Sequence, residues 1–120
     1  MSENIVLTAA DGHELDGYLA VPSGPSKAAI IVVQEVFGVN EHIKSVVNSF
    51  AARGFATIAP AMFDRAEKNV SLNYTPTDTE KARSYVPKLK WEETPLDVGA
   101  AVSKMRDYGS VGLVGYCWGG

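Results

Sequence analysis

The end of the sequence places its single cysteine between glycines. Gly115, Cys117 and Gly119 form a Gly-x-Cys-x-Gly pattern directly after the apolar stretch 111–115. A nucleophile on a sharp turn between a strand and a helix needs small residues two positions before and after it, because larger side chains would collide there. A thiol ionises readily, and the N-terminus of a following helix favours the thiolate. The pattern therefore predicts a cysteine nucleophile for covalent catalysis.

Two other interpretations of this segment are weaker. Free cysteines are usually buried and inert, so Cys117 could be a core residue beside a glycine-rich loop. The strand-like context and both flanking glycines favour the nucleophile instead. A dinucleotide-binding site requires Gly-x-Gly-x-x-Gly in a first strand–helix unit, and residues 112–120 have neither this spacing nor this position.

A carboxylate follows the longest purely apolar run, residues 28–33. Such a run is typical of a strand buried on both faces, and α/β folds keep their active sites at the carboxyl ends of these strands. Glu35 could act there as the base or the charge partner of the thiol, and the backbone N–H of Val36 could donate to an oxyanion. The alternative is that Glu35 is simply a solvated residue at a strand end.

The remaining pattern predicts the α/β elements that would position these groups. Two short runs, 3–8 and 13–21, flank Asp11-Gly12 and indicate an N-terminal hairpin. Apolar residues at helical spacing begin after Asn40, a good N-cap, and end at Arg53-Gly54. The stretch 55–59 then reads as a second buried strand, so 28–59 form a βαβ unit with parallel strands.

The second half predicts a surface excursion, another helix and a last strand. Residues 64–79 are polar and without periodicity, and Asp78 is expected to cap a helix beginning near Thr79. A further helix is expected from Pro95, with Gly109 as its stop. The stretch 111–115 is the last strand. We find no internal repeat and no composition shift, so residues 1–120 are predicted to belong to one domain.

Composition excludes several classes of protein. The chain has 120 residues, 46% of them hydrophobic and 21% charged, with a formal net charge of -3. This balance offers no basic surface for nucleic acid. The start of the chain lacks a signal-like segment, and no apolar run is long enough to cross a membrane. One cysteine forms no internal disulfide, which fits a reducing compartment. We expect a soluble, cytoplasmic protein.

The two motifs together resemble the dienelactone hydrolase family, through residues 34–40 and 112–120 in the same order. The likeness covers essentially the whole chain. It implies an α/β-hydrolase fold, a mostly parallel sheet with an N-terminal antiparallel hairpin. It also implies that Cys117 is the nucleophile, that Glu35 holds or activates the thiol, and that the N–H groups of Val36 and Trp118 form the oxyanion hole.

The family also uses an arginine of the excursion to bind a substrate carboxylate. Arg83 is the best match by position, and a guanidinium pairs bidentately with a carboxylate. Tyr85 is a second candidate for substrate binding. An arginine or tyrosine on a helix face is, however, more often solvated.

The sequence departs from the family pattern after the cysteine. The order of the triad in this fold is nucleophile, acid, histidine, and nothing comes after Gly120 in this sequence. His13 and His42 do not lie where the family keeps its histidine and are expected at the surface. We therefore expect the N-terminal part of such a domain, truncated after the nucleophile turn and inactive alone. Its last strand would expose an apolar edge and favour self-association.

Three functions are compatible with this sequence. The first is a hydrolase of carboxylic esters or lactones, whose small-molecule substrate could carry a carboxylate, with no metal or organic cofactor implied. The second is a cysteine hydrolase of the glutamine-amidotransferase kind, which uses the same pattern with other partners. The third is a non-catalytic truncated remnant, for which Cys117 would alkylate no faster than a model thiol.

Overall fold

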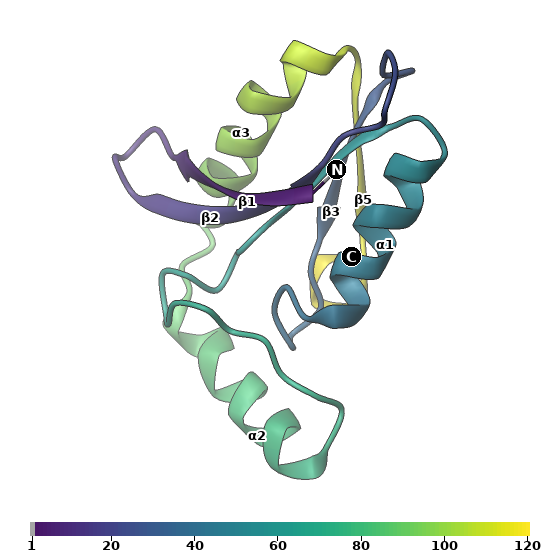
Figure 1. Ribbon diagram of the computed structural model, residues 1–120. Helices are drawn as coiled ribbons and strands as arrows, with labels where there is room; N and C mark the ends of the chain where they lie inside the picture. The colour runs from purple at the N-terminus through teal and green to yellow at the C-terminus, as the bar shows by residue number, and fades with distance from the viewer. Residues whose placement is uncertain (1) are drawn as a thin grey trace.

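The computed structural model describes residues 2–120 and has an α/β architecture (Figure 1). Its five strands form one sheet in the order β1-β2-β4-β3-β5. The strands are β1 (Ser2–Thr8), β2 (Glu14–Ala20), β3 (Ala29–Val33), β4 (Ala56–Pro60) and β5 (Val111–Gly115). The helices are α1 (Glu41–Ala52), α2 (Pro76–Tyr85) and α3 (Thr94–Met105), and short 3-10 turns cover Val86–Lys88, Arg106–Tyr108 and Cys117–Gly119.

Strand directions confirm both the predicted hairpin and the predicted βαβ unit. β1 and β2 pair antiparallel, and β2 continues antiparallel onto β4. β3 lies between β4 and β5 and is parallel to both. Most of β3 and all of β4 are buried, as expected for strands with a helix layer on each face. The carboxyl ends of the three parallel strands therefore lie together at one end of the sheet.

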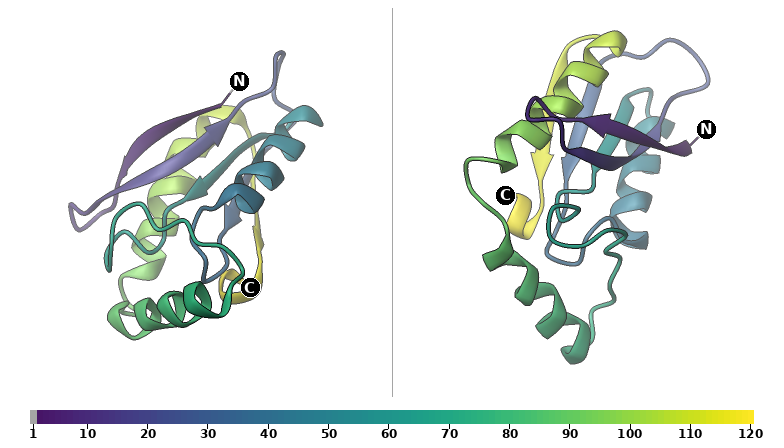
Figure 2. Two further views of the ribbon diagram at one scale, coloured as in Figure 1. Left: turned by 60° about the horizontal axis from the view of Figure 1, so that its bottom comes forward. Right: turned by 90° about the vertical axis from the view of Figure 1, so that its left-hand side faces the viewer.

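The helices α1 and α3 cover opposite faces of the sheet, as the views in Figures 1 and 2 show. On the α1 face, Ile43 and Val47 pack with Val32 and Ala59. The larger core lies on the α3 face, where Met105 packs with Leu15, Ile31, Ile58 and Phe63. Within residues 2–120, no helix is long and apolar enough to cross a membrane.

The first predicted helix is confirmed together with its cap. Asn40 is the N-cap of α1, and its Oδ1 accepts a hydrogen bond of 3.1 Å from the N–H of Ile43. The helix ends where Arg53-Gly54 was expected to stop it, and Gly54 has a φ of +98°.

The predicted start of the second helix is wrong. α2 begins at Pro76, and its N-cap is Thr75, whose hydroxyl accepts from the N–H of Asp78 at 3.1 Å. Proline suits a first helical position, since its missing N–H would have no partner there. Asp78 lies inside the first turn, and its Oδ2 accepts a bond of 2.9 Å from the N–H of Asn73. The polar composition of the excursion hid this Thr75-Pro76 start.

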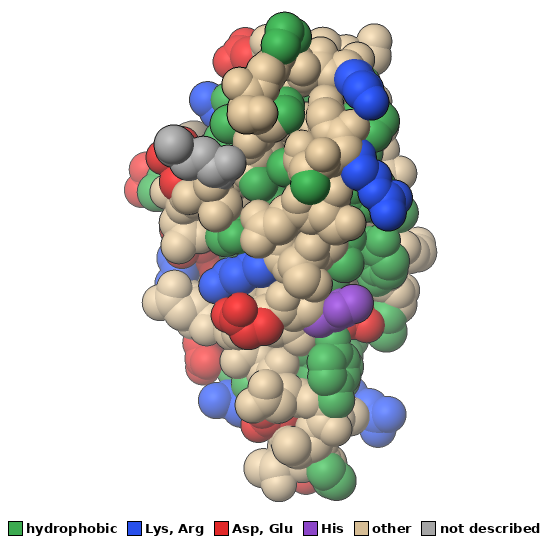
Figure 3. All heavy atoms as spheres, turned by 45° about the vertical axis from the view of Figure 1, so that its right-hand side comes forward, with side chains coloured by type: hydrophobic (Ala, Val, Ile, Leu, Met, Phe, Trp, Pro, Cys, Tyr) green, Lys and Arg blue, Asp and Glu red, His purple; other side chains and the backbone are tan. Residues whose placement is uncertain are grey.

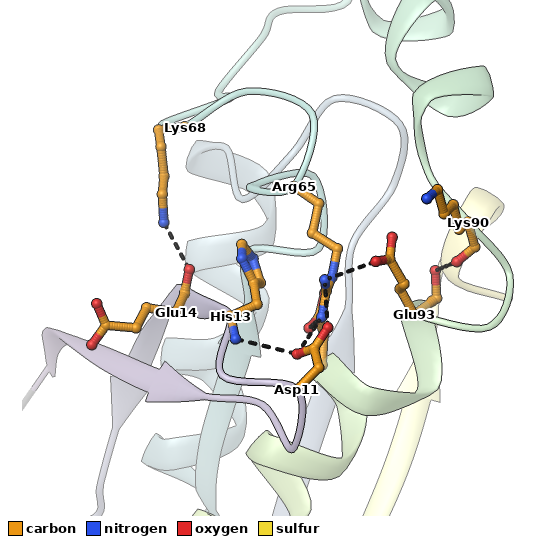
Figure 4. Close-up of polar contacts among 9 residues, drawn as sticks. Asp11, His13, Glu14, Arg65, Lys68, Lys90 and Glu93 are labelled. Atoms are coloured by element: carbon orange, nitrogen blue, oxygen red, sulfur yellow. Dashed lines mark hydrogen bonds and ion pairs between the residues drawn. The ribbon is translucent and has the colours of Figure 1, made fainter.

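The third helix buries a carboxylate that its apolar periodicity did not predict. Asp97 is 1% exposed on α3 and binds Arg65, which follows β4 in the excursion. Arg65 also pairs with Asp11 in the hairpin turn at 2.9 Å and with Glu93 at 3.3 Å (Figure 4). This Arg65 cluster joins the hairpin, the excursion and α3.

The α2 helix lies beyond the carboxyl ends of β3 and β5 (Figure 2). The last turn, Cys117–Gly119, lies at the same end of the sheet. Within the described residues, β5 pairs with β3 alone, and Leu113 is 55% exposed. Hydrophobic side chains gather on the side of the molecule where α1 and β5 lie (Figure 3).

Candidate active site

Cys117 occupies a sharp turn directly after β5. Its φ is +53°, a left-handed conformation that non-glycine residues rarely adopt, and its side chain is exposed. Backbone strain of this kind concentrates at functional sites, where the surrounding structure enforces it. We call residues 115–119 the elbow. The geometry is that of a thiol held out from the end of a strand.

The glycines of the pattern permit the elbow to close. A Cβ at Gly115 would lie 2.0 Å from the carbonyl oxygen of Gly119. A Cβ at Gly119 would lie 2.5 Å from the carbonyl oxygen of Val33 and 2.7 Å from that of Gln34. Real Cβ atoms do not approach backbone oxygens so closely, so both positions require glycine. The same contacts press the elbow against the end of β3.

The end of β3 places Glu35 next to the elbow. The N–H of Tyr116 donates to the carbonyl of Val33 at 3.2 Å. Gln34, 1% exposed, accepts from the N–H of Met62 at 2.8 Å and donates to the carbonyl of Glu35 at 3.1 Å. Gln34 thus ties the ends of β3 and β4 together and fixes the backbone at Glu35. Sequence reasoning missed this role, because a glutamine after a strand gives no signal of its partner.

The N–H groups of Val36 and Trp118 lie on the two turns that follow β3 and β5. Among residues 2–120, neither N–H donates to another group of the protein. The next N–H groups are occupied, since that of Gly38 donates to Glu35 and that of Gly119 donates to Tyr116. Backbone donors left without partners are the groups that an oxyanion hole requires.

The excursion contributes Tyr74, a site residue that the sequence did not reveal. Its hydroxyl donates to Oε1 of Glu35 at 2.5 Å and accepts from Nδ2 of Asn40 at 3.3 Å. Partial desolvation of the hydroxyl and the bond to Glu35 raise the pKa of Tyr74, and the negative charges of Glu35 and of a Cys117 thiolate add smaller contributions. Tyr74 therefore binds Glu35 directly and lies within electrostatic range of Cys117.

Gly38 allows the excursion to reach this position. Its φ is +82°, and a Cβ there would lie 2.1 Å from the carbonyl oxygen of Val70. The two segments are joined by a bridge from Gly38 to Ser71 and by a bond of 2.9 Å from the N–H of Leu72 to the carbonyl of Phe37. This close approach places Tyr74 over Glu35.

Arg83 and Tyr85 have different surroundings on α2. Arg83 is exposed and lines an open groove of about 550 Å³ that also includes Tyr74 and Glu80. Tyr85 is 3% exposed, its hydroxyl donates to Glu67 at 2.7 Å, and its ring lies 6.0 Å from that of Phe63. Phe63 in turn contacts Trp118 at 5.1 Å. Arg83 is thus open to a ligand, whereas Tyr85 supports the elbow from the core.

The two histidines belong to elements other than the elbow. His42 is exposed on α1, as expected. His13 lies in the turn of the hairpin beside the Arg65 cluster (Figure 4) and is half-buried, so the expectation of a surface residue holds only in part. Its Nε2 is buried and has no hydrogen-bond partner within residues 2–120.

Comparison with known proteins decides the family. The sequence profile of the dienelactone hydrolase family matches residues 15–120. The chain belongs to the dienelactone hydrolase family. The arrangement of its five-stranded sheet and helices is therefore that of an α/β-hydrolase, and a solved structure of this family shares it.

Three similar proteins illustrate the match. Carboxymethylenebutenolidase from Pseudomonas putida is 31% identical over 129 aligned residues, covering 100% of this chain and 53% of that protein. A candidate carboxymethylenebutenolidase from Synechocystis sp. is 34% identical, covering 89% and 46%. The crystal structure of a candidate dienelactone hydrolase from Klebsiella pneumoniae has a TM-score of 0.75 at 25% identity, covering 99% and 51%. The chain spans about half the length of the relatives it matches.

Proposed function

We propose that this chain carries the nucleophile of a hydrolase of carboxylic esters or lactones, and that Cys117 is that nucleophile. The observation that supports it is the exposed thiol of Cys117 at a φ of +53°. The turn that holds it has two glycines, and a side chain at either one would collide with backbone atoms. The family membership supports this function over the amidotransferase alternative.

The proposed reaction proceeds through an acyl-enzyme. The thiolate of Cys117 attacks the substrate carbonyl, a C–S bond forms, and the carbonyl oxygen becomes an oxyanion that the N–H groups of Val36 and Trp118 stabilise. Collapse of this intermediate breaks the C–O bond and releases the alkoxide, which takes up a proton. In a lactone the alkoxide remains attached as the opened ring. Water then attacks the thioester, and the carboxylic acid leaves while the thiol is restored.

Residues of α2 would contribute to substrate binding. Arg83 faces an open groove that reaches Tyr74, so a substrate carboxylate could pair with its guanidinium there. Tyr85 would contribute indirectly, because its ring packs near Phe63, and Phe63 in turn contacts Trp118 of the elbow. Glu35 would hold the Cys117 thiol in position through its carboxylate. The histidine and the acid of the triad are proposed to come from a part of the protein outside residues 1–120, since the chain spans about half the length of the relatives it matches.

The test is hydrolysis of an activated ester and of a small lactone by the protein as its gene encodes it. Cys117→Ala should lower kcat/KM by about a thousandfold or more, since it removes the atom that forms the intermediate. Ser23→Ala, an exposed loop substitution, is the control. Retained hydrolysis in Cys117→Ala would contradict the proposal. A Cys117 that alkylates no faster than a model thiol near neutral pH would favour the remnant hypothesis.

A further inference from the structure

A chain of hydrogen bonds runs from the start of α1 to the carboxylate of Glu35, in the loop after β3. Nδ2 of Asn40 donates to the hydroxyl of Tyr74 at 3.3 Å, and that hydroxyl donates to Oε1 of Glu35 at 2.5 Å. A short bond to a carboxylate is of the charge-assisted kind, roughly twice as strong as a bond between neutral groups. The position of the Glu35 carboxylate therefore depends on Tyr74.

The start of this hydrogen-bond chain is rigid because Asn40 forms hydrogen bonds with three partners. It is 4% exposed, and its Oδ1 caps α1 by accepting from the N–H of Ile43. Its Nδ2 donates to the carbonyl of Leu72 at 3.1 Å as well as to Tyr74. The amide orientation is thus fixed by the helix on one side and by the excursion on the other.

Tyr74 is held from two further directions although it is 57% exposed. Its ring meets that of Phe37 edge to face, with centroids 4.5 Å apart. The residue before it, Asn73, donates its N–H to Asp78 in the first turn of α2. The hydroxyl therefore has a defined position over the loop after β3.

The hydroxyl remains a donor at neutral pH. Partial desolvation of the hydroxyl, which lies against Glu35 and Asn40, raises the pKa of Tyr74 above its usual value, and the hydrogen bond to Glu35 raises it further. The bond from Asn40 opposes these effects, while the negative charges of Glu35 and of the Cys117 thiolate add to them. Among the described residues, Glu35 and Cys117 are the ionisable groups that act on Tyr74.

We propose that Tyr74 is a positioning residue of the Cys117 site, which holds the Glu35 carboxylate beside the elbow and reduces its negative charge toward the thiol. This inference rests on the proposed function, since it concerns the same nucleophile. Without the phenol, the carboxylate keeps its full charge near the sulfur, and a like charge disfavours the thiolate. Thiolate formation at Cys117 thus depends on a hydroxyl from the excursion.

The experiment measures alkylation of Cys117 by iodoacetamide against pH in the protein as its gene encodes it. Tyr74→Phe removes the hydroxyl and keeps the ring on Phe37. We expect the midpoint of the alkylation profile to rise, with a rate about twofold or more lower on the acid side of that midpoint. Tyr18→Phe is the matched control, because it removes a hydroxyl that binds Asn48 at 3.2 Å and should leave the profile unchanged.

The same substitution is then made in Glu35→Gln, where no carboxylate charge remains to be reduced. Tyr74→Phe should have no effect on the midpoint in this background. An equal shift in both backgrounds would overturn the proposal, since Tyr74 would then act without Glu35, and so would an unchanged profile in the wild-type background. Alkylation requires no turnover, so this result is separate from the loss of ester hydrolysis in Cys117→Ala that tests the proposed function.

Discussion

Arg65 binds Asp97 through two parallel hydrogen bonds, from Nε to Oδ2 and from Nη2 to Oδ1, each 2.9 Å long. The Asp97 side chain is 2% exposed and that of Arg65 is 11% exposed. Removal of one partner from a buried pair leaves an uncompensated charge, which costs more than the pair itself contributes. The excursion, which carries Tyr74, is therefore fastened to α3 through Arg65.

Arg65→Met should lower the free energy of unfolding by about 3 kcal/mol, because it leaves the buried carboxylate of Asp97 without a cationic partner. Urea denaturation followed by circular dichroism measures this change. Glu93→Gln is the matched control, since Glu93 is a more exposed partner of the same Arg65 guanidinium, with a side chain that is 30% exposed. It should cost less than about 1 kcal/mol. Equal losses in both variants would contradict the assigned importance of the buried pair.

Gly119→Ala should destabilise the elbow by about 2 kcal/mol and displace the thiol, because the new methyl group meets the carbonyl oxygens of Val33 and Gln34. Gly112→Ala adds the same methyl group on β5, where the nearest atom lies 4.0 Å away, and should be tolerated. Denaturation and the rate of Cys117 alkylation are the two measurements. A normal alkylation rate in Gly119→Ala would show that the close approach is unnecessary.

Gly38→Ala should push the excursion away from the loop after β3, since a Cβ would lie 2.1 Å from the Val70 carbonyl oxygen at a φ of +82°. The bond from Tyr74 to Glu35 should then be lost, and the alkylation profile of Cys117 should change as in Tyr74→Phe. Gly24→Ala, with no atom within 4 Å of the added carbon, serves as the control. If both alanine variants keep the wild-type profile, the excursion does not need this contact.

Stability should fall in alkaline solution through Tyr85. Burial, and then the hydrogen bond to Glu67, raise the pKa of Tyr85 from 10.0 to about 12. Between these values the unfolded chain loses the phenolic proton before the folded chain does, so the unfolded state is favoured as pH rises. The stabilisation is complete below pH 10 and disappears through about pH 12. Tyr85→Phe should flatten this part of the profile in melting experiments, and an unchanged slope would contradict the assignment.

The free side of β5 should cause residues 1–120, expressed by themselves, to self-associate. Leu113 is 55% exposed on that strand, and an unpaired strand with apolar side chains recruits other strands. Size-exclusion chromatography coupled to light scattering should show species larger than a monomer. Leu113→Lys should shift the distribution toward the monomer, whereas a clean monomeric profile of the unsubstituted chain would rule the association out.

Local patterns predicted the elements correctly where one segment determines its own structure. The hairpin around Asp11-Gly12, the cap at Asn40 and the elbow at Cys117 all depend on turn and cap chemistry within a few residues. The buried strands were predicted by their continuous apolar runs. These features could be read without knowing what lies opposite them in the fold.

Contacts between distant segments could not be read in the same way. Tyr74 and Glu35 are 39 residues apart, and Arg65 and Asp97 are 32 apart. A polar residue in such a pair looks like any solvated side chain until its partner is placed. The excursion was predicted as irregular, so the residues it contributes to the site and to the core stayed hidden. Partner identity is a property of the tertiary arrangement.

Asn40 links the order of the site to the fraying of a helix. The amide that caps α1 also holds Leu72 and Tyr74, so an opening of the first turn of α1 releases the excursion at the same moment. Helix ends open far more often than whole domains unfold. Amide hydrogens of Ile43 and Leu72 should therefore exchange with solvent as one cooperative unit. The lifetime of the arranged site is then set by local opening of α1, and any ligand that slows this exchange reports binding.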